Sequence, residues 1–142
     1  MKAKEKITTG DEHLDRALGG GIRTGMLWEV CSVLILFLAA AGKTQLALQL
    51  SLLVQIPPRL GGLLGSTCYL TTSSVLPTVR LLDILDAHPL LSPSLCGLHD
   101  VHTMSCPTIP VLIHVLSSTL PQFVDSRLTG QTCETLGHRR SW

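Results

Sequence analysis

The spacing of hydrophobic and polar positions changes several times along the chain, which predicts a succession of helices and strands. Acidic residues open a first short helix over 11–18, and three glycines end it. Apolar residues cover most faces of 45–56, so we expect a buried helix that ends at a Pro-Pro pair. A later helix, capped by Thr108, is predicted by apolar residues at helical spacing: Ile109, Leu112, Ile113, Leu116 and Leu120.

Short runs rich in β-forming residues separate these helical segments. They predict strands over 26–30, 66–72 and 100–106, and Pro77 opens a further helix over 78–87. Strands that alternate with helices are typical of proteins with a parallel sheet and right-handed crossovers. The expected fold class is therefore α/β, with a mainly parallel sheet flanked by helices.

Composition excludes several classes of protein. Apolar residues make up 45% of the 142 residues and charged residues 15%, and the formal net charge is +1. These values argue against a strongly basic nucleic-acid binder and against an intrinsically disordered chain. The apolar run over 30–41 has about a dozen residues, whereas a helix that spans a bilayer needs about 20. We therefore expect no membrane anchor.

The five cysteines include no C-x-x-C pair, which favours a reducing compartment over a secreted disulfide framework. One cluster has the residue types of a metal site: Cys96, His99, His102 and Cys106. Structural zinc sites usually arrange their ligands as two closely spaced pairs, and the order here is mixed. A loop that enters a strand is the favoured interpretation, and metal binding is the alternative.

One short motif carries the candidate chemistry, at the point where the buried helix begins: Ala41, Gly42, Lys43, Thr44 and Gln45. In a phosphate-binding loop, glycine lets the backbone approach the phosphates, lysine neutralises their oxygens, and the threonine hydroxyl reaches Mg²⁺. The complete pattern has another glycine five positions before Gly42, where this chain has Phe37. An aromatic residue disfavours the positive φ that glycine tolerates. The sequence therefore predicts phosphate-binding residues that follow a disrupted loop.

The sequence around this motif resembles the start of the ATPase core of the RecA family, and specifically the eukaryotic recombinase paralogues of homologous recombination. The resemblance extends over 7–127 and is interrupted at about 31–40. It rests on the Gly-rich stretch 8–25, on the segment that starts at Gly42, and on the strand and helix over 68–82 with Arg80. Residues 101–123 look like the next strand and helix of a paralogue that forms heterodimers.

The resemblance implies an ATP-binding recombination mediator. Such a protein assists filament assembly by the main recombinase on single-stranded DNA during double-strand break repair. It would use ATP and Mg²⁺, with Thr44 as the metal ligand, and it would work in the nucleus beside a sister paralogue. Contact with DNA would come through the complex. The alternatives are a truncated, non-catalytic interaction fragment and a different P-loop ATPase of the RecA fold.

The chain departs from the family pattern in ways that bear on activity. The apolar residues 32–39 replace a Gly- and Ser-rich loop, and we interpret them as translated non-coding sequence, such as a retained intron. Ser73 replaces the glutamate that orients the attacking water in the active recombinase, and a hydroxyl is a poor general base. We expect no catalytic residue and little or no ATP hydrolysis.

The resemblance also predicts how the chain is divided. Residues 1–6 are expected to be frayed, 7–127 to form a partial RecA-like core, and 128–142 to be a disordered tail outside the family pattern. The pattern is lost before the strand whose aspartate helps to hold Mg²⁺. We therefore expect the N-terminal part of a larger core.

Overall fold

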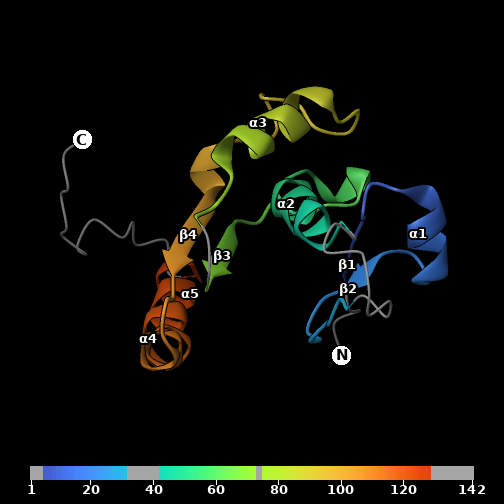
Figure 1. The fold of residues 1–142 in the computed structure, drawn as a ribbon. Coiled ribbons are helices and arrows are strands. Elements are labelled where there is room, and N and C mark those ends of the chain that lie inside the picture. The colour runs from blue at the N-terminus through green and yellow to red at the C-terminus, as the bar shows by residue number, and fades with distance from the viewer. Residues whose placement is uncertain (1–4, 32–41, 73–74, 129–142) are drawn as a thin grey trace, which may run out of the picture. The chain divides into compact units, whose positions relative to one another are not determined.

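A computed structural model describes residues 5–31, 42–72 and 75–128 of the chain (Figure 1). The chain divides into two units. The first comprises Met1–Tyr69 and Leu76–Met104, and the second comprises Leu70–Val75 and Ser105–Trp142. Two features predicted from the sequence lie outside the described residues, namely the non-coding segment 32–39 and nearly all of the tail. The predicted frayed N-terminus lies partly inside them, and Lys6 there belongs to a strand.

The first unit begins with a small antiparallel pair of strands around a short helix. Strands β1 (Lys6–Ile7) and β2 (Ile22–Arg23) pair with Ile7 opposite Ile22. Helix α1 (Glu12–Ala17) confirms the predicted helix, and its Asp11 cap accepts a hydrogen bond from the Leu14 N–H at 2.7 Å. The return to β2 requires Gly21, because its φ is +106° and a Cβ there would lie 2.4 Å from the Ile7 carbonyl oxygen.

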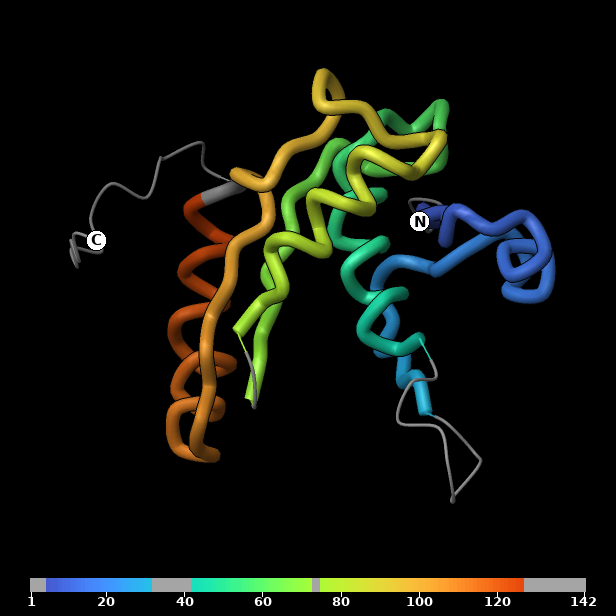
Figure 2. The backbone as a smooth tube through the Cα atoms, turned by 45° about the horizontal axis from the view of Figure 1, so that its top comes forward, coloured from blue at the N-terminus to red at the C-terminus, as the bar shows by residue number. Residues whose placement is uncertain are grey.

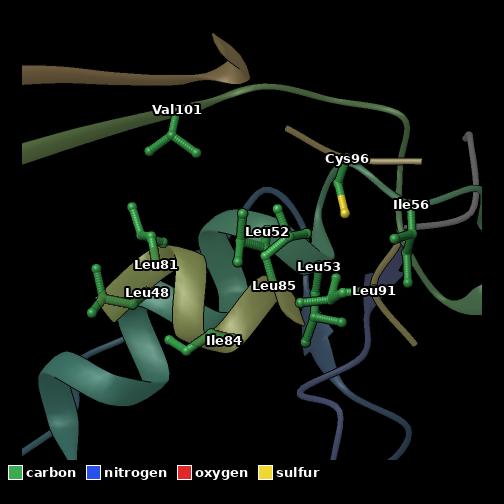
Figure 3. Close-up of a cluster of buried hydrophobic side chains, with 10 residues drawn as sticks. All are labelled: Leu48, Leu52, Leu53, Ile56, Leu81, Ile84, Leu85, Leu91, Cys96 and Val101. Carbon is green, nitrogen blue, oxygen red and sulfur yellow. The ribbon is translucent and has the colours of Figure 1, made fainter. Parts of the chain in front are cut away.

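Two helices of the first unit lie side by side and form most of its core (Figure 2). Helix α2 (Lys43–Leu53) confirms the predicted buried helix and ends three residues early, before the 3₁₀ turn η1 (Pro58–Leu60). Helix α3 (Thr78–Ala87) has the predicted bounds. Figure 3 shows the buried side chains of these two helices and of the segments that follow them, up to the start of the strand at Val101: Leu48, Leu52, Leu53, Ile56, Leu81, Ile84, Leu85, Leu91, Cys96 and Val101.

Strands β3 (Thr67–Thr71) and β4 (Val101–Ser105) form a two-stranded parallel sheet, whose arrows run in the same direction in Figure 1. A 3₁₀ turn, η2 (Leu98–Asp100), leads into β4. Both strands confirm segments that the sequence predicts, and α3 lies between them in the chain. The predicted α/β class with a parallel sheet is therefore confirmed.

The strand predicted over 26–30 is absent from the described residues. The Trp28 ring N–H donates to the Arg23 carbonyl at 3.1 Å, and the Thr24 N–H donates to the Glu5 carbonyl at 2.9 Å. The segment is thus tied back to the β1–β2 pair, and Leu27 is 98% exposed. Residues that favour strands form one only where a neighbouring strand supplies a hydrogen-bonding ladder, and the prediction of a strand here was wrong.

The second unit contains a helical run that follows Thr108: α4 (Ile109–His114), the π-helical segment η3 (Val115–Thr119) and α5 (Leu120–Leu128). The predicted helix is confirmed, but its predicted apolar face is not the buried one. Ile109 and Ile113 are 73% and 59% exposed, whereas Val115 is buried. A π turn adds a residue, so the helical spacing read from the sequence is not kept through η3. None of the described helices is long and apolar enough to cross a membrane.

Candidate functional site

The predicted phosphate-binding residues lie at the N-terminus of α2. Gly42 is the N-cap residue, with φ +76°, and brings no capping side chain. The Leu46 N–H makes the first bond of the helix, to the Gly42 carbonyl oxygen at 2.8 Å. The amides that precede Leu46 have no acceptor within the helix, and the helix dipole favours negative charge at this end. The arrangement is therefore suited to an anion such as a phosphate group.

The side chains of this turn differ in exposure. Lys43 and Thr44 are exposed, and Gln45 is half-buried. Among the described residues, no atom lies within 4 Å of where a Cβ at Gly42 would be, so its positive φ is what favours glycine. Ala41 and Phe37 lie outside the described residues. The structure thus locates the helical half of the predicted site, and its use in binding stays a prediction.

An arginine contact joins this turn to the neighbouring helix. The Arg80 Nε of α3 donates to the Gln45 Oε1 at 3.0 Å, and the Arg80 guanidinium lies 3.5 Å from the Asp83 carboxylate. From the sequence, Arg80 is recognised only as part of the segment that carries the resemblance, without a partner. The two partners lie 35 positions apart in the sequence, so no local pattern predicts this contact.

A second polar cluster holds the Gly-rich N-terminal segment together. The Asp15 carboxylate accepts bonds from the Thr9 N–H and the Thr9 hydroxyl, each at 2.7 Å, and from the Thr8 hydroxyl. Burial acts to raise the pKa of Asp15, but the hydrogen bonds to Thr8 and Thr9 outweigh it and leave that pKa below the usual value. Thr9 is 1% exposed, so this carboxylate satisfies a buried hydroxyl.

Helix α2 also holds this segment. The Gln49 Nε2 donates to the Thr9 carbonyl oxygen at 2.6 Å and lies 3.3 Å from the His88 Nε2, just beyond the end of α3. The helix that begins with the candidate phosphate-binding residues therefore contacts the N-terminal segment about two turns later.

The alternative of a metal site receives no support. Among the described residues, no group of three or more His, Cys, Asp or Glu is placed to hold a metal ion. Cys96 is buried, with its thiol 3.3 Å from the Ser92 carbonyl oxygen, and His99 is exposed beside Asp100. Cys106 donates its backbone N–H to the Thr71 carbonyl oxygen at 2.7 Å. Ser73, the position of the missing glutamate, lies outside the described residues.

Comparisons with known proteins identify the family. The Rad51 family model matches residues 2–104. DNA repair protein rhp57 of Schizosaccharomyces pombe is 34% identical over 124 residues, covering 81% of this chain and 33% of the relative. DNA repair protein RAD57 of Saccharomyces cerevisiae is 35% identical over 117 residues, covering 82% of this chain and 24% of the relative. The DNA repair protein XRCC3 homolog of Arabidopsis thaliana is 41% identical over 90 residues, covering 63% of this chain and 28% of the relative.

The chain spans about a third or less of the length of these curated relatives. The family match covers most of the chain, and it includes the Gly-rich segment, the turn at Gly42 and the strand–helix–strand run from β3 to β4. The resemblance inferred from the sequence is thus confirmed, and the chain belongs to the Rad51 family.

Proposed function

We propose that this chain is a nucleotide-binding part of a protein that acts in recombinational DNA repair. Three relatives are named as DNA repair proteins, and the chain shares their family. One observation carries the nucleotide proposal: a glycine at positive φ caps a helix whose first two residues are Lys43 and Thr44. The ligand would be ATP with Mg²⁺, bound through its phosphates.

The residues of this turn fit the phosphate end of a nucleotide. In the proposed complex, the Lys43 ammonium group neutralises phosphate oxygens, and the Thr44 hydroxyl is a ligand of Mg²⁺. The open space at Gly42 lets the backbone approach the phosphates, and Ala41 and Gln45 complete the proposed binding residues. Bound Mg²⁺ would offset phosphate charge. The bond from Arg80 to Gln45 would hold the turn against α3 while the anion binds.

The finer proposal is that of a mediator. The protein would assist filament assembly by the main recombinase on single-stranded DNA, in the nucleus and as a heterodimer with a sister paralogue. Its support is the family resemblance and the names of the relatives. ATP hydrolysis is not part of this proposal, because Ser73 occupies the position of the water-orienting glutamate.

A second candidate function is a non-catalytic interaction module that contacts a partner paralogue. Large apolar side chains that are more than half exposed favour it, among them Leu27 in the first unit and Ile109 and Ile113 in the second. Exposed apolar residues are characteristic of surfaces that bind other proteins when they form a contiguous patch. Such a module would bind its partner without any dependence on ATP.

A binding titration separates the two functions. A fluorescent ATP analogue with Mg²⁺ is titrated into the full chain, the Lys43→Ala variant and a charge-matched control, Arg59→Ala, at an exposed residue of η1. A hydrogen bond to a charged group contributes about 1.5–3 kcal/mol, so Lys43→Ala should weaken binding roughly 10- to 100-fold. The Arg59→Ala affinity should equal that of the parent chain.

A loop-restored variant, Phe37→Gly, should bind more tightly than the parent chain, because glycine tolerates the positive φ of a phosphate-binding loop. Absence of binding at millimolar nucleotide in both the parent chain and Phe37→Gly would rule out the nucleotide proposal. Equal affinities of the parent chain and Lys43→Ala would rule it out as well. Co-purification of a sister paralogue, unchanged by ATP, would then establish the interaction module.

A further inference from the structure

His88 occupies a junction that the proposed nucleotide site does not use. It follows the last residue of α3, is half-buried, and meets nitrogen atoms on both sides of its ring. Its Nε2 lies 3.3 Å from the Gln49 Nε2 of α2, and its Nδ1 accepts from the Leu90 N–H at 3.2 Å. The same Gln49 nitrogen donates to the Thr9 carbonyl oxygen. The imidazole is thus anchored at the end of α3 by the bond from Leu90, and its other nitrogen is in contact with Gln49, which itself bonds the N-terminal segment.

The N-terminal segment also packs directly on this ring. A Cβ at Gly10 would lie 2.5 Å from the His88 Nε2 and 2.7 Å from the Gln49 Nε2. The Gly10 backbone thus lies against the ring with no room for a side chain. A change in the charge or position of the imidazole will act on Thr9 and Gly10.

The hydrogen bonds around the ring oppose a positive charge on it. A neutral imidazole has a single acceptor nitrogen, whereas an imidazolium has two N–H donors and no acceptor. Both neighbours of the ring are donors, so with Nδ1 accepting from the Leu90 N–H the neutral ring carries its own N–H at Nε2, beside the Gln49 NH₂ group. Protonation of His88 would therefore add an N–H at Nδ1, which removes the bond from Leu90 that anchors the ring, and would place a positive charge beside the Gln49 NH₂ group and the Gly10 backbone. Burial acts in the same direction and lowers the pKa of His88 below its usual value of 6.5.

Two features of the elements around His88 favour the protonated ring, and the other nearby charged groups have partners of their own or lie on other elements. The C-terminal dipole of α3 and Asp86 on that helix both favour a cation. In the N-terminal segment, the Asp15 carboxylate is bonded to Thr8 and Thr9, and the Asp11 carboxylate caps α1. On α1, Glu12 pairs with Arg16, and His13 is exposed. The only charged residue of α2 is Lys43, in its first turn. The segment 89–97 carries no charged residue.

We propose that His88 is an acid-sensitive latch, which holds the segment Thr8–Gly10 against α2 and α3 while neutral and releases it when a solvent proton binds the ring. The folded state has the lower pKa and so binds fewer protons than the unfolded state. The stabilisation is therefore complete above pH 6.5 and is lost as the pH falls through 6.5 toward the folded pKa. The latch does not depend on nucleotide binding.

NMR spectroscopy of the full chain between pH 7.5 and 5.0 tests the latch. The His88 ring should titrate with a midpoint below 6.5, and the Thr9 and Gly10 amides and the Gln49 side-chain amide should shift with the same midpoint. The hydrogen-exchange protection factor of the Thr9 amide should fall several-fold over this range. In His88→Gln, which stays neutral, these signals should not follow that titration, whereas His13→Gln, at an exposed histidine of α1, should behave as the parent chain.

Three results would overturn the latch. One is a His88 midpoint at or above 6.5, and another is a set of Thr9 and Gly10 signals that stay constant while the ring titrates. The third is the same pH dependence in His88→Gln as in the parent chain. Should His88→Gln not fold, the ring midpoint and the Thr9 shifts of the parent chain decide the matter by themselves.

Discussion

At the scale of single residues, Asp15 determines how the N-terminal segment is held. Its two carboxylate oxygens accept from one N–H and two hydroxyl groups of Thr8 and Thr9. An amide at this position would keep one acceptor oxygen and set an NH₂ group against these donors. We expect Asp15→Asn to lower the free energy of unfolding by about 1–3 kcal/mol, measured by urea denaturation at pH 7.

The matched control is Asp86→Asn, at an exposed carboxylate of α3 that makes no comparable bonds, and its effect should stay within about 0.5 kcal/mol. Because the hydrogen bonds lower the pKa of folded Asp15 below 3.8, the unfolded state binds more protons in acid. Its contribution is therefore present above pH 3.8 and is lost as the pH falls through the folded pKa. Denaturation at pH 3 should show a smaller difference between parent and Asp15→Asn than at pH 7; an equal difference would contradict this reading.

Leu64 is a residue in an unfavourable backbone conformation. It has φ +53°, and its side chain is 68% exposed, so little packing offsets the cost of a left-handed conformation. We expect Leu64→Gly to raise the free energy of unfolding by about 0.5–1 kcal/mol, because glycine adopts this φ without strain. The gain is partly cancelled because glycine gives the unfolded chain more conformational entropy. Thermal denaturation measures the change.

Leu64→Ala is the control for side-chain loss, because alanine keeps the positive φ and removes only the exposed apolar group. Its unfolding temperature should match that of the parent chain. A stabilisation by Leu64→Ala as large as that by Leu64→Gly would show that exposure of the side chain, and not the backbone, is responsible.

At the scale of elements, the packing of α2 against α3 supplies most of the described core. Leu52 of α2 is fully buried, whereas Leu82 of α3 is 43% exposed. Truncation of a fully buried leucine removes its transfer free energy and leaves a cavity, so Leu52→Ala should destabilise by about 2–5 kcal/mol. Leu82→Ala should cost less than about 1 kcal/mol in the same urea titration. Similar losses for the two variants would contradict the placement of Leu52 in the core.

The elements also show what a sequence can reveal about this fold. Helix α3 was predictable because Pro77 and the pair His88-Pro89 mark its ends by local chemistry. The conformation of the segment 26–30 was not predictable, because strand formation depends on a partner strand that is distant in the sequence. The burial of Val115 was not predictable either, because it lies in the π turn Val115–Thr119, which breaks the helical spacing and has no sequence signature here.

The candidate site divides in the same way. The position of Gly42, Lys43 and Thr44 at the start of a helix was predictable, because the motif directly precedes a run of apolar residues. The contacts from Gln45 to Arg80 and from Gln49 to Thr9 were not, because their partners lie 35 and 40 residues away in the chain. Such contacts depend on tertiary packing, which local spacing does not encode.

At the scale of the whole molecule, the low charge of the chain is compatible with the proposal that contact with DNA comes through a complex. A net charge of +1 and 4% aromatic residues do not provide the positive, aromatic groove that binds single strands. The chain spans about a third or less of its curated relatives. What it contains of the Rad51 family is the segment that begins the proposed nucleotide site and the helices that support it.

The most direct test of the central claim is an NMR titration of the ¹⁵N-labelled full chain with ATP and Mg²⁺. If the phosphates bind at this turn, the Gly42, Lys43, Thr44 and Gln45 amides should show saturable shifts that are larger than those anywhere else in α2 and that are lost in Lys43→Ala. Saturation with no shift at these four amides, or with the largest shifts elsewhere in the chain, would contradict the assignment of the α2 N-terminus as the phosphate-binding site.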